Sequence, residues 1–333
     1  MRAMVLSAQA AVETSPLSAS DQPMPEPGPG EARVRVRACG ACRTDIHVIE
    51  GDLPARRLPL VPGHQVVGTV DSLGPGATRF RAGDRVGIAW LRSTCGRCRF
   101  CLGGSENLCA QSTYAGWTHD GGYAEYACVP EAFAYAIPPV FGDAEATPLL
   151  CAGIIGYRAL RRSQVPKGGR LGLYGFGSSA HVTLQVARHW GCTVYVATRE
   201  PARQRLALEL GAAWAGAAGD PLPDKLDGAI VFAPVGALVP IALRDLDKGG
   251  TVALAGIHMT DLPAMGYEPH LFWEKTLRSV TANTRADGEA LLAEAAAIPI
   301  RPRVTRYRLE DANRALADIK SSEVEATAVL MLD

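Results

Sequence analysis

Four cysteines stand within one short polar stretch of the chain, in the order C-x2-C-x2-C-x7-C. They are Cys95, Cys98, Cys101 and Cys109. Four thiolates at this density can close a tetrahedron around Zn2+, and such a site is structural because no ligand position stays open. Thiolates also hold iron–sulfur clusters, which is the alternative assignment. Zinc is favoured because the spacing occurs together with the motifs described below.

A second set of potential metal ligands is spread widely along the chain. Cys42 begins the stretch Cys-Arg-Thr-Asp-Ile-His, His64 lies in Pro-Gly-His-Gln, and Cys151 lies in the apolar run Leu-Leu-Cys-Ala-Gly-Ile. Taken singly, a histidine beside a strand is usually structural, and a cysteine in an apolar run usually belongs to the core. Alongside the four-cysteine loop, the three residues form a specific pattern.

A glycine-rich motif, Gly175-Phe-Gly177-Ser-Ser-Ala, follows an apolar strand expected at 171–174 and precedes a helix expected at 178–190. In this G-x-G-x-x-A pattern the first glycine makes the turn, and the second lets the backbone approach a pyrophosphate. Ser178 and Ser179 open the helix, whose positive end attracts the phosphates. With a second strand expected at 193–198, the motif predicts a dinucleotide site.

Together these motifs resemble those of the zinc-dependent medium-chain alcohol dehydrogenases, and the resemblance covers essentially all 333 residues. It implies that Cys42, His64 and Cys151 hold a catalytic zinc with an open fourth position, so that the chain binds two Zn2+ in all. Two thiolates and one imidazole leave the metal centre near neutral and electrophilic. A bound alcohol then loses its proton more easily, and a bound carbonyl is polarised.

The resemblance also assigns roles beside the catalytic zinc. Thr44 matches the hydroxyl that touches the substrate oxygen, and His47 matches the histidine that passes the proton to solvent. Asp45 matches a carboxylate that orients the zinc histidine, here His64. The chain departs from the family at Gln65, where Glu is usual. We expect the neutral amide to leave the site more electropositive, so that zinc-bound alcohol ionises at a lower pH than in a Gln65→Glu variant.

The end of the second strand is expected to select the cofactor. Thr198 falls where NAD-binding members of the family carry an acidic residue for the ribose 2′-hydroxyl. The Thr198 hydroxyl, the Arg199 guanidinium and, as a further contact, Arg203 suit a 2′-phosphate instead. Glu200 could compete, but we expect it to lie past the strand and face solvent. The sequence therefore predicts NADP(H) over NAD(H). The family binds nicotinamide and ribose at later strand ends, here Ala233, Gly256 and Ile257.

Candidates for the substrate pocket are mostly large and apolar. The indole of Trp90 is expected to narrow the pocket, and Leu53 stands where a second aromatic side chain would narrow it further. This lining contains no Arg or Lys, which favours uncharged alcohols, aldehydes or ketones of small to medium size. Each candidate could instead be an ordinary core residue. The candidates are Leu53, Trp90, Tyr114, Trp117 and Ile257.

The elements that must position these residues fall into two patterns. Residues 1–152 are rich in Gly and Pro with short alternating runs, which predicts a β-rich domain, GroES-like by the resemblance. Residues 153–295 alternate strands and helices, which predicts an α/β Rossmann domain with a doubly wound parallel sheet. The tail, 296–333, is expected to rejoin the first domain through a helix at 309–320 and a strand at 326–332.

Composition narrows the functional classes. The chain is 47% hydrophobic and 20% charged, with 34 basic and 34 acidic residues, so a general nucleic-acid or membrane-surface binder is excluded. No apolar run reaches the roughly 18 residues of a membrane helix, and no secretory signal is evident. We expect a cytoplasmic enzyme that forms a homo-oligomer, as family members do. The alternatives are a zinc-free quinone or enoyl reductase on the same fold, or a non-enzymatic binding protein with only the structural zinc.

Overall fold

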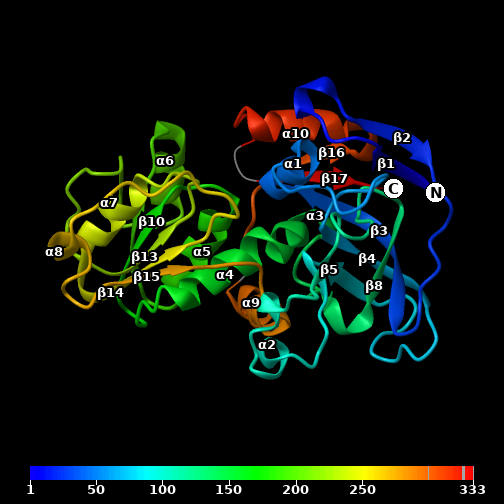
Figure 1. The fold of residues 1–333 in the computed structure, drawn as a ribbon, viewed down its shortest axis with the longest axis horizontal. Helices are drawn as coiled ribbons and strands as arrows, with labels where there is room; N and C mark the ends of the chain where they lie inside the picture. The colour runs from blue at the N-terminus through cyan, green and yellow to red at the C-terminus, as the bar shows by residue number, and fades with distance from the viewer. Residues whose placement is uncertain (299, 325–326, 333) are drawn as a thin grey trace. The chain divides into compact units, whose positions relative to one another are not determined.

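The computed structural model describes residues 1–298, 300–324 and 327–332, and the chain divides into two compact units (Figure 1). The first unit holds Met1–Cys151, Ala282–Ala296 and Arg301–Asp333, and the second holds Ala152–Thr281 and Ala297–Ile300. The sequence placed 153–295 in the Rossmann domain, whereas the division by contacts places 282–295 with the first unit.

Residues 282–296 belong to the first unit because their side chains bond there. The Asn283 amide donates to the Tyr135 hydroxyl at 3.3 Å, and the Arg285 guanidinium pairs with Glu106 at 2.6 Å. The local sequence pattern of this segment does not say which unit it packs against.

The first unit is built on a mixed sheet in the order β16-β17-β3-β4-β5-β9, with β8 also paired to β3. The pair β16–β17 is parallel, and the other neighbours are antiparallel. The strands are β3 (Glu31–Ala41), β4 (Gln65–Leu73), β5 (Arg85–Ile88), β8 (Tyr126–Pro130), β9 (Ala134–Ala136), β16 (Val304–Arg308) and β17 (Thr327–Met331).

The register of β3 against β4 positions the candidate ligands. In the first half of β3, Ala32, Val34 and Val36 are buried and alternate with arginines, as expected for a strand with one face on a core. The antiparallel register pairs Gly40 with Gln65. Cys42 follows β3 and His64 precedes β4, so the two residues meet at the same end of the strand pair.

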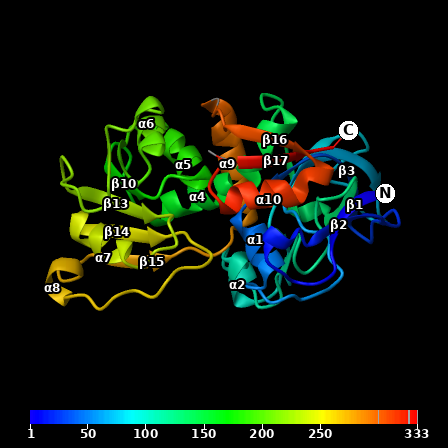
Figure 2. The same cartoon turned by 90° about the horizontal axis from the view of Figure 1, so that it is seen from above.

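Shorter elements surround this sheet. The expected helix at 309–320 is a 3-10 turn, Leu309–Asp311, followed by α10, which packs beside α1 (Figures 1 and 2). The strand expected at 326–332 is β17, and Ala326 lies outside the described residues. The other elements are β1 (Arg2–Leu6), β2 (Leu17–Asp21), β6 (Leu91–Ser93), β7 (Thr113–Tyr114), α1 (Arg43–Glu50), α2 (Arg99–Leu102), α3 (Asp143–Ala146), α9 (Arg285–Ala297), α10 (Ala312–Lys320) and the 3-10 turns Val12–Thr14, Glu106–Leu108, Glu131–Phe133 and Thr147–Leu150.

The second unit is the expected doubly wound fold. Its strands form a parallel sheet in the order β12-β11-β10-β13-β14-β15. Helix α7 covers one face of the sheet, and α4 and α5 cover the other (Figure 1). The elements are α4 (Ala152–Arg162), β10 (Arg170–Tyr174), α5 (Ser178–His189), β11 (Thr193–Ala197), α6 (Pro201–Glu209), β12 (Trp214–Gly216), β13 (Leu226–Val231), α7 (Leu238–Asp245), β14 (Leu246–Leu254), α8 (Tyr267–His270) and β15 (Thr276–Ser279).

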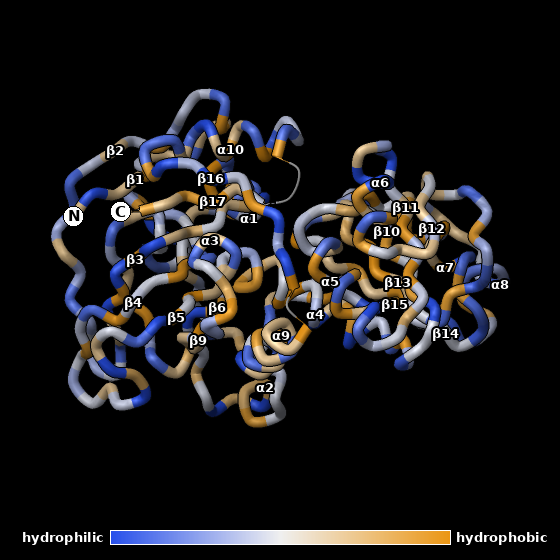
Figure 3. Tube along the Cα trace, turned by 180° about the vertical axis from the view of Figure 1, so that it is seen from behind, coloured by the Kyte–Doolittle hydropathy of each residue, from blue (hydrophilic) through white to orange (hydrophobic). Residues whose placement is uncertain are grey.

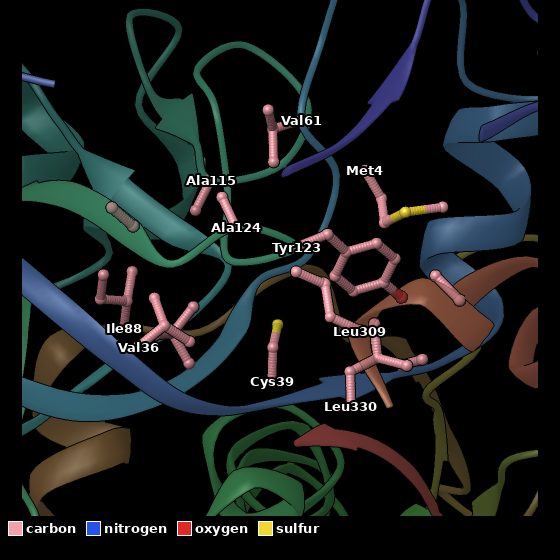
Figure 4. Close-up of a cluster of buried hydrophobic side chains, with 14 of the residues drawn as sticks. Met4, Val36, Cys39, Val61, Ile88, Ala115, Tyr123, Ala124, Leu309 and Leu330 are labelled. Carbon is pink, nitrogen blue, oxygen red and sulfur yellow. The ribbon is translucent and has the colours of Figure 1, made fainter. Parts of the chain in front are cut away.

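Each unit has its own apolar interior. Figure 3 shows hydrophobic residues gathered on the strands inside each unit, with polar residues on the loops. Figure 4 shows part of the first core, where Tyr123 and Cys39 lie among aliphatic side chains. Among the helices of the described residues, none is long and apolar enough to cross a membrane.

Candidate active site

Cys42, His64 and Cys151 converge in the first unit. His64 Nε2 lies 3.6 Å from Cys42 Sγ and 3.3 Å from Cys151 Sγ. Zn–S bonds of about 2.3 Å and Zn–N bonds of about 2.0 Å in a tetrahedron place sulfur and nitrogen about 3.5 Å apart. The donor atoms therefore fit zinc without rearrangement, and three donors leave a fourth position open.

Asp45 fixes the orientation of His64. One carboxylate oxygen lies 3.1 Å from His64 Nδ1, and the other accepts from the Cys42 amide at 2.8 Å. Burial disfavours the imidazolium, but the charges of Asp45 and Cys42 outweigh it and raise the pKa of His64 to about 10. With Nδ1 held as a donor to Asp45, Nε2 is the atom directed at the two thiols.

The two thiols are unequal. A hydrogen bond from Cys151 holds the pKa of Cys42 well below that of a free cysteine, and His64 adds to the effect against the cost of burial. Burial of Asp45 in the same cluster raises the pKa of its carboxyl group. Zinc binds thiolate and displaces protons from its ligands, so a cluster that already stabilises one thiolate is suited to the metal.

Helix α1 carries the other residues expected at this centre. It begins directly after Cys42, and Thr44 and His47 lie one turn apart on the same face. His47 Nδ1 contacts Asp52 Oδ2 at 2.7 Å. Asp52 was not expected from the sequence, because the turn after α1 brings it back toward the helix and no local pattern marks the pairing.

The four-cysteine loop also has the geometry of a metal site. Cys101 Sγ lies 3.5 Å from Cys98 Sγ and 3.9 Å from Cys95 Sγ. The corresponding sulfur–sulfur distance in a tetrahedral zinc site is about 3.8 Å. Backbone N–H groups of Arg97 and Cys98 lower the pKa of Cys95 to about 6, because they stabilise the thiolate. The Cys109 sulfur lies close enough to complete the set.

A charged pair anchors this loop to α9. Arg285 donates to Glu106 through Nε at 3.0 and 3.1 Å and through a terminal nitrogen at 2.6 Å, and its backbone N–H adds a fourth contact at 2.8 Å. Its guanidinium also stacks 4.6 Å from the centre of the Phe133 ring. The pairing joins α9 to the four-cysteine loop within the first unit.

The glycine motif of the second unit forms the expected turn. Gly175 ends β10 with φ +94°, and an added Cβ would lie 2.8 Å from the Ala233 nitrogen. No atom lies within 4 Å of a Cβ added at Gly177, among the residues described, so its backbone is open to a ligand. Ser178 and Ser179 begin α5, and Gly256 and Ile257 follow β14.

Glu200 lies past the end of β11 and is exposed to solvent, as expected. Its carboxylate also accepts a hydrogen bond from the Thr198 hydroxyl at 3.2 Å, a contact that the sequence did not indicate. Arg199 is 90% exposed, and Arg203 lies 4.0 Å from Glu200. Glu200 takes the N-cap position of α6.

The rings of Trp90, Tyr114 and Trp117 form a cluster that begins beside His64. The Trp90 ring meets His64 edge-on with centroids 5.0 Å apart, and it stacks on Trp117 at 5.8 Å with planes 9° apart. Tyr114 lies 5.0 Å from Trp90. A cation also lies beside these rings, because the Arg56 guanidinium lies 5.5 Å from the centre of the Trp117 ring.

The remaining expected residues are placed as follows. Leu53 is half-buried beyond α1, with its N–H donating to the His47 carbonyl at 3.0 Å. Ile257 is exposed on the second unit. Gln65 is fully buried, and within the described residues its amide oxygen and nitrogen have no hydrogen-bond partner.

Comparison with known proteins identifies the family. The family model described as "Alcohol dehydrogenase GroES-like domain" matches residues 28–139, and the model "Zinc-binding dehydrogenase" matches residues 180–297. A Mycobacterium tuberculosis (strain CDC 1551 / Oshkosh) protein named "Probable alcohol dehydrogenase AdhA" is 55% identical over 300 residues, which are 89% of this chain and 87% of that protein.

Solved structures agree with this assignment. A cobalt- and zinc-bound thermostable alcohol dehydrogenase from Pyrobaculum aerophilum matches with a TM-score of 0.89 and 26% identity, over 100% of this chain and 99% of that one. A structure from Sinorhizobium meliloti 1021 bound to NADP matches with a TM-score of 0.87 and 27% identity, over 99% of both chains. The chain belongs to the zinc-dependent medium-chain alcohol dehydrogenase family.

Proposed function

We propose that the chain transfers hydride reversibly between NADP(H) and an uncharged alcohol, aldehyde or ketone of small to medium size, with zinc at Cys42, His64 and Cys151. The observation that carries the proposal is the convergence of these residues, whose donor atoms lie within 4.8 Å of one another. A zinc-free reductase or a binding protein with one structural zinc has no need of this buried donor set.

The chain's own residues prepare the reaction. When bound, zinc supplies a Lewis acid that lowers the pKa of an alcohol hydroxyl and polarises a carbonyl. Asp45 keeps the proton of His64 on Nδ1, so that Nε2 serves as a ligand. The Thr44 hydroxyl receives the substrate proton, and His47, held by Asp52, passes it to solvent.

Metal content and activity test the proposal together. We expect two zinc ions per wild-type chain, and one in each of the variants Cys151→Ser and Cys98→Ser. We also expect an absorbance change from NADP+ reduction with simple alcohols, which Cys151→Ser abolishes. A wild-type chain with one zinc and no turnover would favour the binding protein, and turnover of quinones without zinc would favour the reductase.

The relay can be tested by a matched pair of variants. Thr44→Ser keeps the hydroxyl, and Thr44→Val removes it at nearly constant volume. Proton transfer by a positioned group contributes about 100- to 10,000-fold, so Thr44→Val is expected to lower kcat within that range with unchanged zinc content. Equal activity of the two variants would remove Thr44 from the relay.

The NADP(H) preference rests on Thr198, Arg199 and Arg203, and Glu200 opposes it. A hydrogen bond to a charged group contributes about 1.5 to 3 kcal/mol, which corresponds to a preference of roughly 10- to 150-fold. We expect Arg199→Ala to lower kcat/KM for NADPH more than for NADH. We expect Glu200→Gln to favour NADPH further, because a carboxylate repels the 2′-phosphate. Equal kcat/KM for both cofactors in the wild-type chain would contradict the proposal.

The setting of the enzyme follows from its surface and its cysteines. All nine cysteines are free, which suits the reducing cytoplasm, where we place the protein. We propose a homo-oligomer because Tyr267, Phe272 and Trp273 are exposed beside the edge strand β15. Large exposed apolar groups of this kind mark interaction surfaces.

A further inference from the structure

The turn that carries His64 is enclosed by residues 121–123, a segment in which the sequence showed no functional signal. Three successive backbone N–H groups, of Gly121, Gly122 and Tyr123, donate to carbonyls of residues 61–63 at 2.7, 3.0 and 2.9 Å. A run of three bonds fixes the backbone just before the ligand. The segment therefore acts as a clamp on the His64 turn.

The clamp has no room for additional atoms. A Cβ on Gly121 would lie 1.9 Å from the Gly63 carbonyl oxygen. Gly63 itself has φ +96°, and a Cβ there would lie 2.4 Å from Tyr123 Cδ1. The Tyr123 ring thus packs directly on the turn, with nothing between it and the residue before His64.

The hydroxyl of Tyr123 is placed among apolar groups. Tyr123 is fully buried, and among the described residues its hydroxyl has no hydrogen-bond partner. Figure 4 shows the ring between Met4, Leu309 and Leu330. Burial raises the pKa of Tyr123 well above its usual value, and the nearby Asp45 carboxylate adds to the rise.

Asp45 has capacity for this donor. Its two oxygens accept from His64 and from the Cys42 amide, whereas a carboxylate offers about four acceptor positions. A buried hydroxyl is costly to leave unpaired, and an ionised carboxylate is the strongest acceptor available to it.

We propose that Tyr123 is a positioning residue of the catalytic metal centre: its ring holds the Gly63 turn, and its hydroxyl, unpaired among the described residues, donates to a free acceptor position of Asp45 after a small adjustment of the two side chains, so that it supports the residue that orients His64. The inference rests on the proposed function, because it requires a metal at Cys42, His64 and Cys151. It assigns the metal centre a support that reaches from His64 through Asp45 into the hydrophobic core.

Metal release tests this role. Groups that support a metal ligand typically change metal affinity by about 10- to 100-fold. Protein loaded with Zn2+ or Co2+ is mixed with a chelator in excess, and the two release phases are assigned with Cys151→Ser and Cys98→Ser. We expect Tyr123→Phe to release the catalytic metal about tenfold faster or more, to change the Co2+ absorption of that site, and to leave the four-cysteine phase unchanged.

Tyr135→Phe is the matched control, because Tyr135 is also buried in the first unit but bonds to Asn283. It is expected to leave both phases at the wild-type rate. The proposal is overturned if Tyr123→Phe leaves catalytic-site release unchanged, or if it accelerates both phases equally, as general destabilisation would. A wild-type chain that never binds the second metal would instead refute the proposed function.

Discussion

One carboxylate oxygen of Asp45 accepts a hydrogen bond from the His64 imidazole, and the other accepts one from the Cys42 amide. A single side chain therefore orients two of the three proposed metal ligands. The residue next to His64 has no such arrangement. Gln65 is fully buried, and among the described residues its amide oxygen and nitrogen have no hydrogen-bond partner. A Cβ added to Gly40 would lie 2.9 Å from the Gln65 amide oxygen, so the side chain is tightly enclosed. A neutral side chain at this position keeps negative charge away from the metal.

Replacing this amide by a carboxylate is expected to change the pH dependence of catalysis. In Gln65→Glu, an added negative charge disfavours ionisation of the substrate hydroxyl at the metal, because a like charge raises the pKa of a group that becomes an anion. The acidic limb of the kcat/KM profile for alcohol oxidation should therefore move to higher pH. The measurement is the pH–rate profile of both proteins with one alcohol.

Gln65→Met is the control for this prediction, because it removes the amide without adding charge. The acidic limb of its kcat/KM profile is expected to lie at the same pH as that of the wild-type protein. A limb that moves to lower pH in Gln65→Glu, or moves equally in both variants, would show that charge at this position is not the cause.

The ligands were accessible from the sequence, and their partners were not. Cysteine spacing indicated the four-cysteine site, the family resemblance implied Cys42, His64 and Cys151, and the structure brings each set together. Asp52 and Tyr123 became visible only with the fold, because their contacts depend on how loops return to α1 and to the His64 turn. The hydrogen bond from Thr198 to Glu200 and the position of Arg56 beside the Trp117 ring were missed for the same reason.

At the scale of elements, the turn between β10 and α5 separates two uses of glycine. Gly175 requires φ +94° and lies against Ala233, so its lack of a side chain serves the fold. Gly177 has an extended backbone with φ −107°, and open space surrounds it. The two glycines therefore differ in conformation, in keeping with the separate roles that the motif gives them.

This difference predicts separable effects of alanine. Gly177→Ala should leave thermal stability nearly unchanged but weaken NADPH binding at least tenfold, because the methyl group occupies space that the pyrophosphate needs. Gly175→Ala should also lower stability, since left-handed backbone costs about 1 to 2 kcal/mol for residues with a Cβ. Thermal unfolding and fluorescence titration with NADPH measure the two effects. Equal loss of stability in both variants would contradict the distinction.

The four-cysteine loop depends on few apolar contacts. Leu102 is 76% exposed and Leu108 is 45% exposed, so the metal and the Glu106–Arg285 pair must supply much of its order. Glu106 is 9% exposed in its side chain and Arg285 is 40% exposed, which reduces the contribution of the pair through solvent screening. Burial opposes ionisation of Glu106, but Arg285 outweighs it and lowers the pKa of the carboxyl group.

A stability difference that depends on pH follows from this pair. Because the pKa of Glu106 is lower in the folded chain, its contribution is present above the unfolded value near 4.5 and is lost as pH falls through the folded value. Glu106→Gln should reduce the free energy of unfolding by about 1 to 2 kcal/mol at neutral pH, less than the full value of a hydrogen bond to a charged group because solvent screens the partly exposed Arg285. The difference from wild type should shrink below about pH 4. Urea unfolding at the two pH values measures it.

The control for this pair is Glu289→Gln, since Glu289 is 59% exposed beside Arg79. Exposed pairs contribute at most about 1 kcal/mol, so this variant should stay close to wild type at both pH values. A loss in Glu106→Gln that is the same at both pH values would mean that charge is not what holds the loop.

For the whole molecule, the sequence pattern predicted the fold type of each unit, but it did not predict every boundary between the two units. Alternating strands and helices indicated the parallel sheet, and short Gly- and Pro-punctuated runs indicated the β-rich unit. The sequence placed residues 282–295 with the Rossmann domain, but their contacts lie in the first unit, and a local sequence pattern does not determine which unit a segment packs against. The contacts that decide, Asn283 with Tyr135 and Arg285 with Glu106, join residues more than one hundred positions apart.

Net charge and surface apolarity together predict self-association. The formal charge is zero, so no long-range repulsion opposes contact between copies. Tyr267, Phe272 and Trp273 are 66%, 51% and 45% exposed, and Phe272 packs edge-on against both other rings. β15, which follows this cluster, ends the sheet of the second unit and leaves one row of backbone groups without a strand partner among the described strands.

Light scattering with size-exclusion chromatography tests this prediction. The wild-type mass is expected to be a multiple of 35.2 kDa. Phe272→Asp should shift the mass toward the monomer, because it places a charge in the centre of the aromatic cluster. Leu102→Asp changes an apolar residue of the first unit that is even more exposed than Phe272, and it should leave the mass unchanged. If only Leu102→Asp caused dissociation, the interface would lie at the four-cysteine loop and not at the aromatic cluster. If the wild-type protein were a monomer, the predicted self-association would be wrong.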